Sequence, residues 1–347
     1  LKMLWLKTAC PYRASPFMEE SLRHEVRQLC SHYGPSRGAA WQCVFITLVY
    51  TGLTFSVMVH RPNALTVLLY ASSLIRMFML FHDACHGSCF GDTRMDKTLS
   101  RIAGLPIQWS PAYWKHSHNE HHQHLGDVSV FDGSLTIRHT REELMAMSWH
   151  IRCLYRFIRD PFIFFPLVSF FVFILPLGRI KRKSFLGPVA YCTVLPLSMG
   201  ILIGTQAAAL HILSLWLAGL GGALIFHLQH QCNTPYRVMH EQHSVWDAGM
   251  LGSTHLQIPW PLSFVSLGIE FHHIHHASTR VPCYQLARCH AEGKKSDLWS
   301  RAGVNSVGPQ QAALSVFHSL YDCKVTTDGR PAKFRSFEPY QSLGLHT

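Results

Sequence analysis

Three histidine clusters are the part of this chain best suited to chemistry. They read HDACH at 82–86, HNEHH at 118–122 and HHIHH at 272–276. Residues three and four apart share one face of a helix, so HxxxH directs two imidazoles toward one point and HxxHH directs three. The pattern therefore predicts eight convergent ligands: His82, His86, His118, His121, His122, His272, His275 and His276. Four ligands satisfy a tetrahedral zinc ion, so eight indicate two metal ions, and a set this rich in imidazole suits iron.

Chance patterns must be weighed, because the chain holds 25 histidines in 347 residues. At that frequency a random chain would contain HxxxH about twice but HxxHH only about 0.13 times. The second and third clusters therefore carry the inference, against the alternative that the histidines merely decorate a wet interface. Cys85 and Cys89 interleave with the first cluster. Packing in the interior is the expected role of these two cysteines, and metal binding is the alternative.

Apolar residues are concentrated in blocks that predict membrane helices. Hydrophobic residues make up 48% of the chain, yet the mean hydropathy is only slightly positive. About 20 helical residues cross the roughly 30 Å of hydrocarbon in a bilayer. Four blocks meet this need: 44–59 with its flanks, 63–81, 185–203 and 206–226. We therefore predict an all-α, polytopic integral membrane protein with four transmembrane helices and a cytoplasmic, histidine-rich helical cap.

A fifth apolar block, 162–177, has 16 residues and contains Pro166 and Pro176. Ligands of one site must lie on one side of the membrane, so an even number of crossings must separate the second cluster from the third. We therefore predict that 162–177 is re-entrant or interfacial rather than a span. The positive-inside rule agrees, because the basic run at 179–183 lies on the histidine side and the turn at 204–205 is uncharged. Both termini and all three clusters are then expected to face the cytoplasm.

The net charge of +11 indicates cytoplasmic loops near anionic lipid rather than nucleic-acid binding. The expected organisation is a cytoplasmic N-terminal segment over 1–43, a membrane domain with the histidine clusters over 44–290, and a cytoplasmic tail over 291–347. Arg76, near the end of the second expected span, is predicted to extend toward the interface.

The three clusters, in this order, resemble the histidine boxes of the membrane fatty acid desaturases. The likeness covers residues 65–290 and includes WKHSH at 114–118, YRF at 155–157 before Asp160-Pro161, QHQ at 229–231, Trp246 with Gly252-Ser253, and RVPCY at 280–284. The chain is most similar to the acyl-lipid omega-6, or delta-12, subgroup. It departs from that subgroup at Ala84-Cys85, where Cys-Gly is usual, and at CNTPY over 232–236, where an acidic and aromatic run is usual.

The resemblance implies a ninth metal ligand, His230, at the end of the last expected span. His227 is the alternative, although it can equally support a ligand from behind. Three carboxylates stand beside ligand positions and are expected to accept the remaining N–H groups of the ligands, with simple solvation as the alternative: Asp83, Glu120 and Glu270. His116 and His273 lie off the ligand faces and are expected to support ligands or to lie at the surface.

The resemblance also implies an activity, an O2-dependent, di-iron desaturase that introduces a cis double bond into the fatty acyl chain of a membrane lipid. Oleoyl to linoleoyl is the favoured conversion. An unactivated C–H bond has no acidic proton, so a cofactor must carry the hard step. A separate electron donor of the ferredoxin or cytochrome b5 type is expected to dock on the basic cytoplasmic face, because no cytochrome-like or ferredoxin-like domain is recognisable in these 347 residues.

Two other functions remain as alternatives. A fatty acyl, alkane or carotenoid hydroxylase or ketolase could use the same histidine di-iron site. A metal transporter is the alternative outside enzymes, but it would place its ligands near the middle of the bilayer, and only His211 lies within an expected span.

Overall fold

The computed structural model describes residues 18–127, 129–130, 144–174, 186–232, 236, 238 and 240–317. Helices dominate these residues, so the all-α prediction is confirmed. One feature was not predicted, a parallel pair of short strands, β1 (Thr254–Leu256) and β2 (Asn305–Val307). Strands of three residues are too short to show an alternating pattern in the sequence.

Three described helices are long and apolar enough to cross a membrane: α2 (Arg37–His60), α3 (Ala64–His86) and α10 (Thr205–Gln231). They contain the first and fourth predicted blocks and all of the second except Asn63, which caps α3. The third block corresponds to α9 (Leu186–Leu202), whose 17 residues begin at the edge of the described chain. Their rise of about 25 Å is slightly less than the hydrocarbon thickness. The four predicted spans therefore appear as three full-length helices and one shorter helix.

Residues 162–174 of the fifth block belong to α8 (Pro161–Ser169) and a π-helical turn, η1 (Phe170–Ile174), and residues 175–177 lie outside the described part of the chain. The preceding helix, α7 (Trp149–Arg159), is bent from them by 71°. Such a bend fits both a broken span and a re-entrant segment, so the re-entrant interpretation stays a prediction. Gly219 lets this segment approach α10 closely, because a Cβ there would lie 2.5 Å from the Phe173 ring and from the Ser169 hydroxyl.

Helices α3 and α10 run parallel, side by side. Near their N-terminal ends, the Tyr70 hydroxyl lies 2.9 Å from His211 Nδ1, and Ser214 Oγ donates to the Val67 carbonyl. Their C-terminal ends carry His82, His86 and His230. Both helices therefore place histidines at the same end. This agrees with the even number of membrane crossings that the sequence required between the second and third histidine clusters.

Arg76 of α3 is buried among three helices. Its Nε donates to Thr47 Oγ1 of α2 at 3.0 Å, and its Nη1 donates to the carbonyl of Phe264 in α12 (Leu262–Ser266). Its guanidinium also lies 4.2 Å from the centroid of the Phe264 ring. The prediction that Arg76 extends to the interface is wrong, because a hydroxyl, a carbonyl and an aromatic face replace water around the cation.

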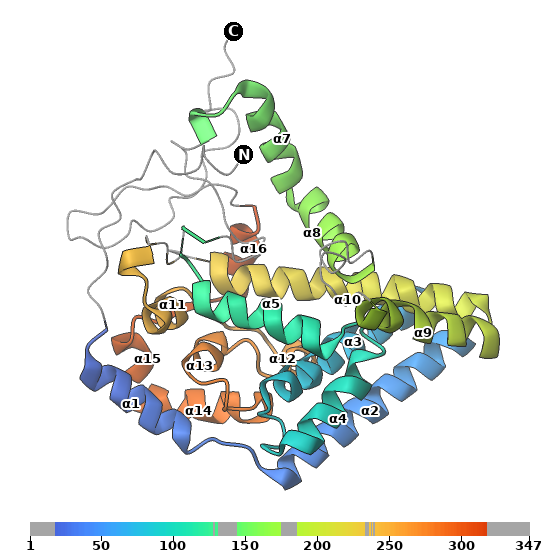
Figure 1. Ribbon diagram of the computed structural model, residues 1–347, viewed down its shortest axis with the longest axis horizontal. Helices are drawn as coiled ribbons and strands as arrows, with labels where there is room; N and C mark the ends of the chain where they lie inside the picture. Colours follow the sequence, from blue (N-terminus) through green and yellow to red (C-terminus); the bar gives the residue numbers. More distant parts are fainter. Residues whose placement is uncertain are drawn as a thin grey trace.

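The remaining helices gather around the histidine-bearing ends of α3 and α10 (Figure 1). They are α1 (Glu20–Ser31), α4 (Thr93–Gly104), α5 (Pro111–His124), η3 (His240–Gln242), α11 (Val245–Leu251), α13 (His272–Ala277), α14 (Cys283–Lys295), α15 (Leu298–Arg301) and α16 (Pro309–Ser315). Helix α1 packs against α13 and α14, and α11 packs against α13 and α5. This cap encloses the histidine clusters from the side opposite the apolar helices.

Candidate metal centre

Each histidine box lies on its own helix, as its spacing predicted. The first box forms the last turn of α3, which ends at once because Gly87 adopts a left-handed conformation with φ of +77°. The second box lies on α5, which begins with Pro111 in its first turn. The third box makes up most of the short helix α13. The QHQ segment is the last turn of α10.

The boxes meet in two groups of four histidines. In each group, four ring nitrogens, one from each residue, lie within 4.8 Å of one another. The first group is His82, His86, His118 and His275; the second is His121, His230, His272 and His276. The second and third boxes each contribute to both groups, so α5 and α13 hold the two groups side by side.

His122, the one expected ligand that belongs to neither group of four, lies between the two groups. Its Nε2 is 2.9 Å from Nε2 of His118 and 2.9 Å from Nε2 of His275, both in the first group. Its ring centroid is 4.3 Å from that of His276 in the second group. The structure therefore brings all nine predicted ligand side chains together.

The ring orientations fit a bound cation. Nδ1 of His82 lies 2.9 Å from Asp83 Oδ1, and Nδ1 of His230 lies 2.9 Å from the Gly252 carbonyl. These acceptors assign the proton to Nδ1, which leaves a lone pair on each Nε2 directed into its group. The buried Nε2 of His86 has no hydrogen-bond partner among the residues that the structure describes. Lone pairs that converge in this way repel one another unless a metal ion or a proton lies between them.

Burial also favours the neutral form of five of the nine imidazoles. The pKa values of five of them are lowered well below the ordinary 6.5, first because burial disfavours the charged form and then because neighbouring imidazoles repel a second charge: His118, His122, His272, His275 and His276. Neutral imidazole is the form that binds metals.

The three predicted supporting carboxylates have different partners. Asp83 is buried and contacts His82, as expected. Glu120 instead pairs with His116, with Oε1 3.0 Å from Nε2, and both side chains are partly exposed. Glu270 is buried and accepts a hydrogen bond from the Ser266 hydroxyl. Burial raises the pKa of Glu270.

His227 is buried but lies outside both groups, and its ring packs 5.2 Å from that of Phe165. The structure thus favours His230 over His227 as the ninth ligand. His273 is fully buried against Trp299, with ring centroids 4.8 Å apart, so the expectation of a surface position is wrong for this residue.

Cys85 and Cys89 are buried and belong to neither group. Burial raises the pKa of the Cys89 thiol, which keeps it protonated and unsuited to metal binding.

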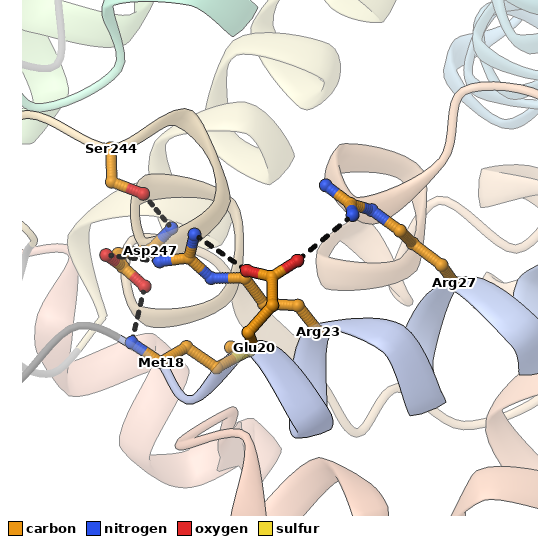
Figure 2. A network of polar contacts seen from close by, with 6 residues as sticks. All are labelled: Met18, Glu20, Arg23, Arg27, Ser244 and Asp247. Carbon is orange, nitrogen blue, oxygen red and sulfur yellow. Dashed lines mark hydrogen bonds and ion pairs between the residues drawn. The ribbon is translucent and has the colours of Figure 1, made fainter.

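Helix α11 supports the third box, although the sequence did not predict that its residues belong to the site. A Cβ on Gly249 would lie 3.0 Å from His276 Cβ, so the absence of a side chain permits this contact. The buried carboxylate of Asp247 accepts a hydrogen bond from the Met18 backbone and lies 3.5 Å from Arg23 of α1 (Figure 2). The only sequence signal was the likeness around Trp246 and Gly252.

An apolar cavity of about 550 Å³ leads to both histidine groups. Its walls come from α3, α5, α8, η1 and α10, and include Leu74, Phe78, Trp114, Phe164, Val172 and Phe226. Four of the nine histidines reach this cavity, His82 and His118 from the first group and His121 and His272 from the second. The cavity has the size and the apolar lining of a small-molecule site.

Comparisons with known proteins agree with this geometry. The family model for fatty acid desaturase matches residues 60–306, more than half of the chain and all three boxes. A fatty acid desaturase of Bacillus subtilis is 28% identical over 290 residues, 80% of this chain and 79% of that protein. The sn-1 oleoyl-lipid 12-desaturase of a Synechocystis species is 22% identical over 276 residues, 74% and 76% of the two chains. The chain is therefore a multi-pass membrane protein that belongs to the fatty acid desaturase family.

Proposed function

We propose that the chain is an O2-dependent desaturase that acts on an acyl chain of a membrane lipid and binds two iron ions through nine histidines. The observation that carries this proposal is the apolar cavity, because its lining includes histidines of both groups. A methylene chain held there would lie beside both groups at once. The nine ligands would be His82, His86, His118, His121, His122, His230, His272, His275 and His276.

The protein's contribution to the reaction is positioning and exclusion of water. Iron would supply O2 activation and the removal of hydrogen from an unactivated carbon, which side chains cannot do. The apolar walls around Phe78 and Phe226 would hold the chain extended and keep water out. Asp83 would keep the His82 ring in one tautomer and one orientation. The acyl chain would lose two hydrogen atoms, and a donor protein would supply two electrons. Together with two protons from solvent, these would reduce O2 to two water molecules.

For the substrate, we propose oleoyl as the acyl chain and linoleoyl as the product. Adjacent methylenes differ little in chemistry, so the position of the chain in the cavity decides which pair reacts. Support comes from the likeness to the omega-6 subgroup and from the name of the Synechocystis relative, an oleoyl-lipid 12-desaturase. The acyl-lipid carrier is part of the same proposal.

The electron donor would be a separate protein of the ferredoxin or cytochrome b5 type, on the cytoplasmic side together with both termini. Exposed basic side chains on α4 and α5 support docking of an acidic partner: Arg94, Lys97, Arg101 and Lys115. Charge complementarity of this kind mainly raises the association rate and is weakened by salt.

Expression in a host that makes oleate but no linoleate tests the proposal. Linoleate should appear in the membrane lipids with the wild-type chain and should be absent with His275→Ala. Hydroxylated oleate would instead establish the hydroxylase alternative. A new double bond on the carboxyl side of C9 would reject the delta-12 assignment and leave the desaturase assignment intact.

A further inference from the structure

Helix α7 turns its apolar side chains outward. Trp149 is 69% exposed, Phe157 61% and Leu154 53%, and none of the helix's 11 residues is buried. At about 100° per residue, Leu154, Phe157 and the exposed Ile151 and Ile158 share a face about 120° wide. The exposed His150 lies within this face, and Trp149 lies beyond its edge, beside Arg156. The arginines at 152, 156 and 159 form a narrow stripe on the opposite side, and each is only half-exposed. A helix in water would show the reverse pattern of exposure.

The neighbouring helix fixes where α7 lies along α10. At the start of α8, the Phe165 ring packs 5.2 Å from that of His227, near the histidine-bearing end of α10. Further along, Ser169 Oγ donates to the carbonyl of Trp216, about three turns deeper. Helix α8 therefore descends beside α10 from its histidine-bearing end, and α7 joins it at that end.

The direction of α7 differs from that of the spans. It is bent by 71° from α8 and η1, and Figure 1 shows it crosswise to α10, projecting beyond the helical body. Its main packing contact among the described elements is with α8. The segment that follows it is also apolar and exposed, with Phe162 78% and Phe171 45% exposed. The bare face of α7 is thus continuous with the exposed apolar surface of α8 and η1.

We propose that α7 lies in the interface of the bilayer, on the side that carries the histidines, and inserts its apolar face at the boundary between headgroups and acyl chains. Trp149 and Tyr155 are residue types that favour this boundary. The arginine stripe would face the headgroups and water, and its long side chains can reach lipid phosphates. An amphipathic helix with arginines opposite aromatic and aliphatic side chains is typical of interfacial segments.

A second copy of the chain fits this face less well than lipid does. Eleven helical residues are only about 16 Å long, and a helix is about 10 Å wide. The face can therefore cover on the order of 160 Å², whereas a stable interface needs about 800 Å² on each partner. A bilayer does not need α7 alone to bury about 800 Å², because it would also contact the adjoining apolar segment of α8 and η1.

With α7 in the bilayer interface, the α8 wall of the cavity would also be held in place. This consequence rests on the proposed function. The guanidinium of Arg159 lies 4.8 Å from the ring centroid of Phe164. Phe164 and Val168 of α8 line the cavity. Anchoring α7 in the interface would therefore keep α8 against α10 and preserve the shape of the cavity.

Depth-dependent quenching tests the position of α7 without reference to activity. The full-length chain, with Cys10, Cys153, Cys192 and Cys323 changed to serine, is labelled with a fluorophore at Leu154→Cys or at Arg152→Cys. Nanodiscs of phosphatidylcholine and phosphatidylglycerol carry a nitroxide near the carboxyl end of one acyl chain. We expect about threefold stronger quenching at position 154 than at 152. Equal quenching, or quenching of 154 by aqueous iodide instead, overturns the proposal. Energy transfer between labelled copies would also overturn it, in favour of a dimer contact.

A matched pair of variants tests the consequence for the cavity. Phe157→Glu places a charge on the α7 face, whereas Leu314→Glu places one at a similarly exposed apolar residue of α16, with exposures of 61% and 60%. In nanodiscs, Phe157→Glu should lower turnover about fivefold or more at unchanged iron content, and Leu314→Glu should stay within about twofold of wild type. Equal effects of the two variants would reject the role of α7 in holding the cavity. If wild type itself is inactive while the quenching result holds, the proposed substrate fails and the interfacial helix stands.

Discussion

The carboxylate of Asp83 connects the first histidine box to the backbone of Cys283, 200 positions further along the chain. Its Oδ2 accepts the Cys283 N–H at 2.6 Å, and its Oδ1 lies 2.9 Å from Nδ1 of His82. The side chain is buried, so these two donors take the place of water. One carboxylate thus orients a metal-binding ring and also connects α3 to the start of α14, the next helix after the third box.

Asp83→Asn should therefore damage the metal centre. Asparagine keeps one acceptor oxygen but places an NH2 donor opposite either the His82 ring or the Cys283 N–H, which are both donors. We expect a loss of roughly 10- to 100-fold in iron affinity or turnover. Asp96→Asn is the matched control, because Asp96 is equally buried and accepts the Phe90 N–H but lies outside both histidine groups. Iron analysis of both purified variants decides the matter, and equal losses would contradict the role of Asp83.

His230 and His227, one helical turn apart on α10, should respond differently to alanine. Nε2 of His230 lies 3.1 Å from Nε2 of His121 and 3.0 Å from Nε2 of His272, so its removal opens the second group. We expect His230→Ala to lose about half of the bound iron and nearly all turnover. His227→Ala should retain its iron, since this ring packs on phenylalanines instead. Iron counts that are the same for the two variants would show that the assignment of ligands is wrong.

The cavity can be filled at Gly222 without disturbing the backbone. Gly222 lines the cavity, and a Cβ built there meets no atom within 4 Å. Gly222→Leu should project into the space proposed for the acyl chain and lower turnover of an 18-carbon chain about tenfold or more, with iron content unchanged. Gly52→Leu is the control, because Gly52 is a helical glycine with similarly open space that lies outside the cavity lining. Both substitutions replace glycine by a better helix former, so only the cavity differs between them. Wild-type turnover in Gly222→Leu would rule out this cavity as the substrate site.

An ion pair outside the metal centre gives a prediction for pH. Nδ1 of His240 lies 2.7 Å from Asp127 Oδ2, which joins η3 to the loop after α5. The hydrogen bond to Asp127 raises the pKa of His240 above 6.5. Burial opposes ionisation of Asp127, but hydrogen bonds from His240 and Ser129 outweigh it and lower the pKa of this carboxyl below 3.8.

The sign of the pH effect follows from these shifts. Because the pKa of His240 is raised, its ion pair stabilises the fold fully below pH 6.5, and this stabilisation is lost as the pH rises through the pKa of His240 in the folded state. Because the pKa of Asp127 is lowered, its contribution to stability is present above pH 3.8 and is lost in stronger acid. The difference in Tm between wild type and His240→Ala should be largest near about pH 5.5 and shrink toward about pH 9. The effect should be small and sensitive to salt, because His240 is exposed. His60→Ala is the control, since the exposed His60 contacts the Ser56 carbonyl rather than a carboxylate. A difference that grows with pH would contradict the ion pair.

Local geometry was readable from the sequence alone. Helix spacing relates residues up to four positions apart, so each box could be assigned its own ligand face, and Asp83 could be placed beside His82. Apolar length predicted the membrane helices, because the thickness of the bilayer sets the number of residues required. The requirement for an even number of crossings likewise agrees with the parallel arrangement of α3 and α10.

Relations between distant segments were decided only by the tertiary structure. The packing of α5 and α13 against the ends of α3 and α10 divides the second and third boxes between two groups. Nothing in the spacing could pair His118 with His275, because that contact depends on how two helices meet. The partners of two buried charged residues also depended on tertiary packing: Glu270 accepts a hydrogen bond from Ser266, and Arg76 donates to the Phe264 carbonyl. One residue along a helix rotates a side chain by about 100°, so neighbours in sequence such as His272 and His273 enter different surroundings once the helices are packed.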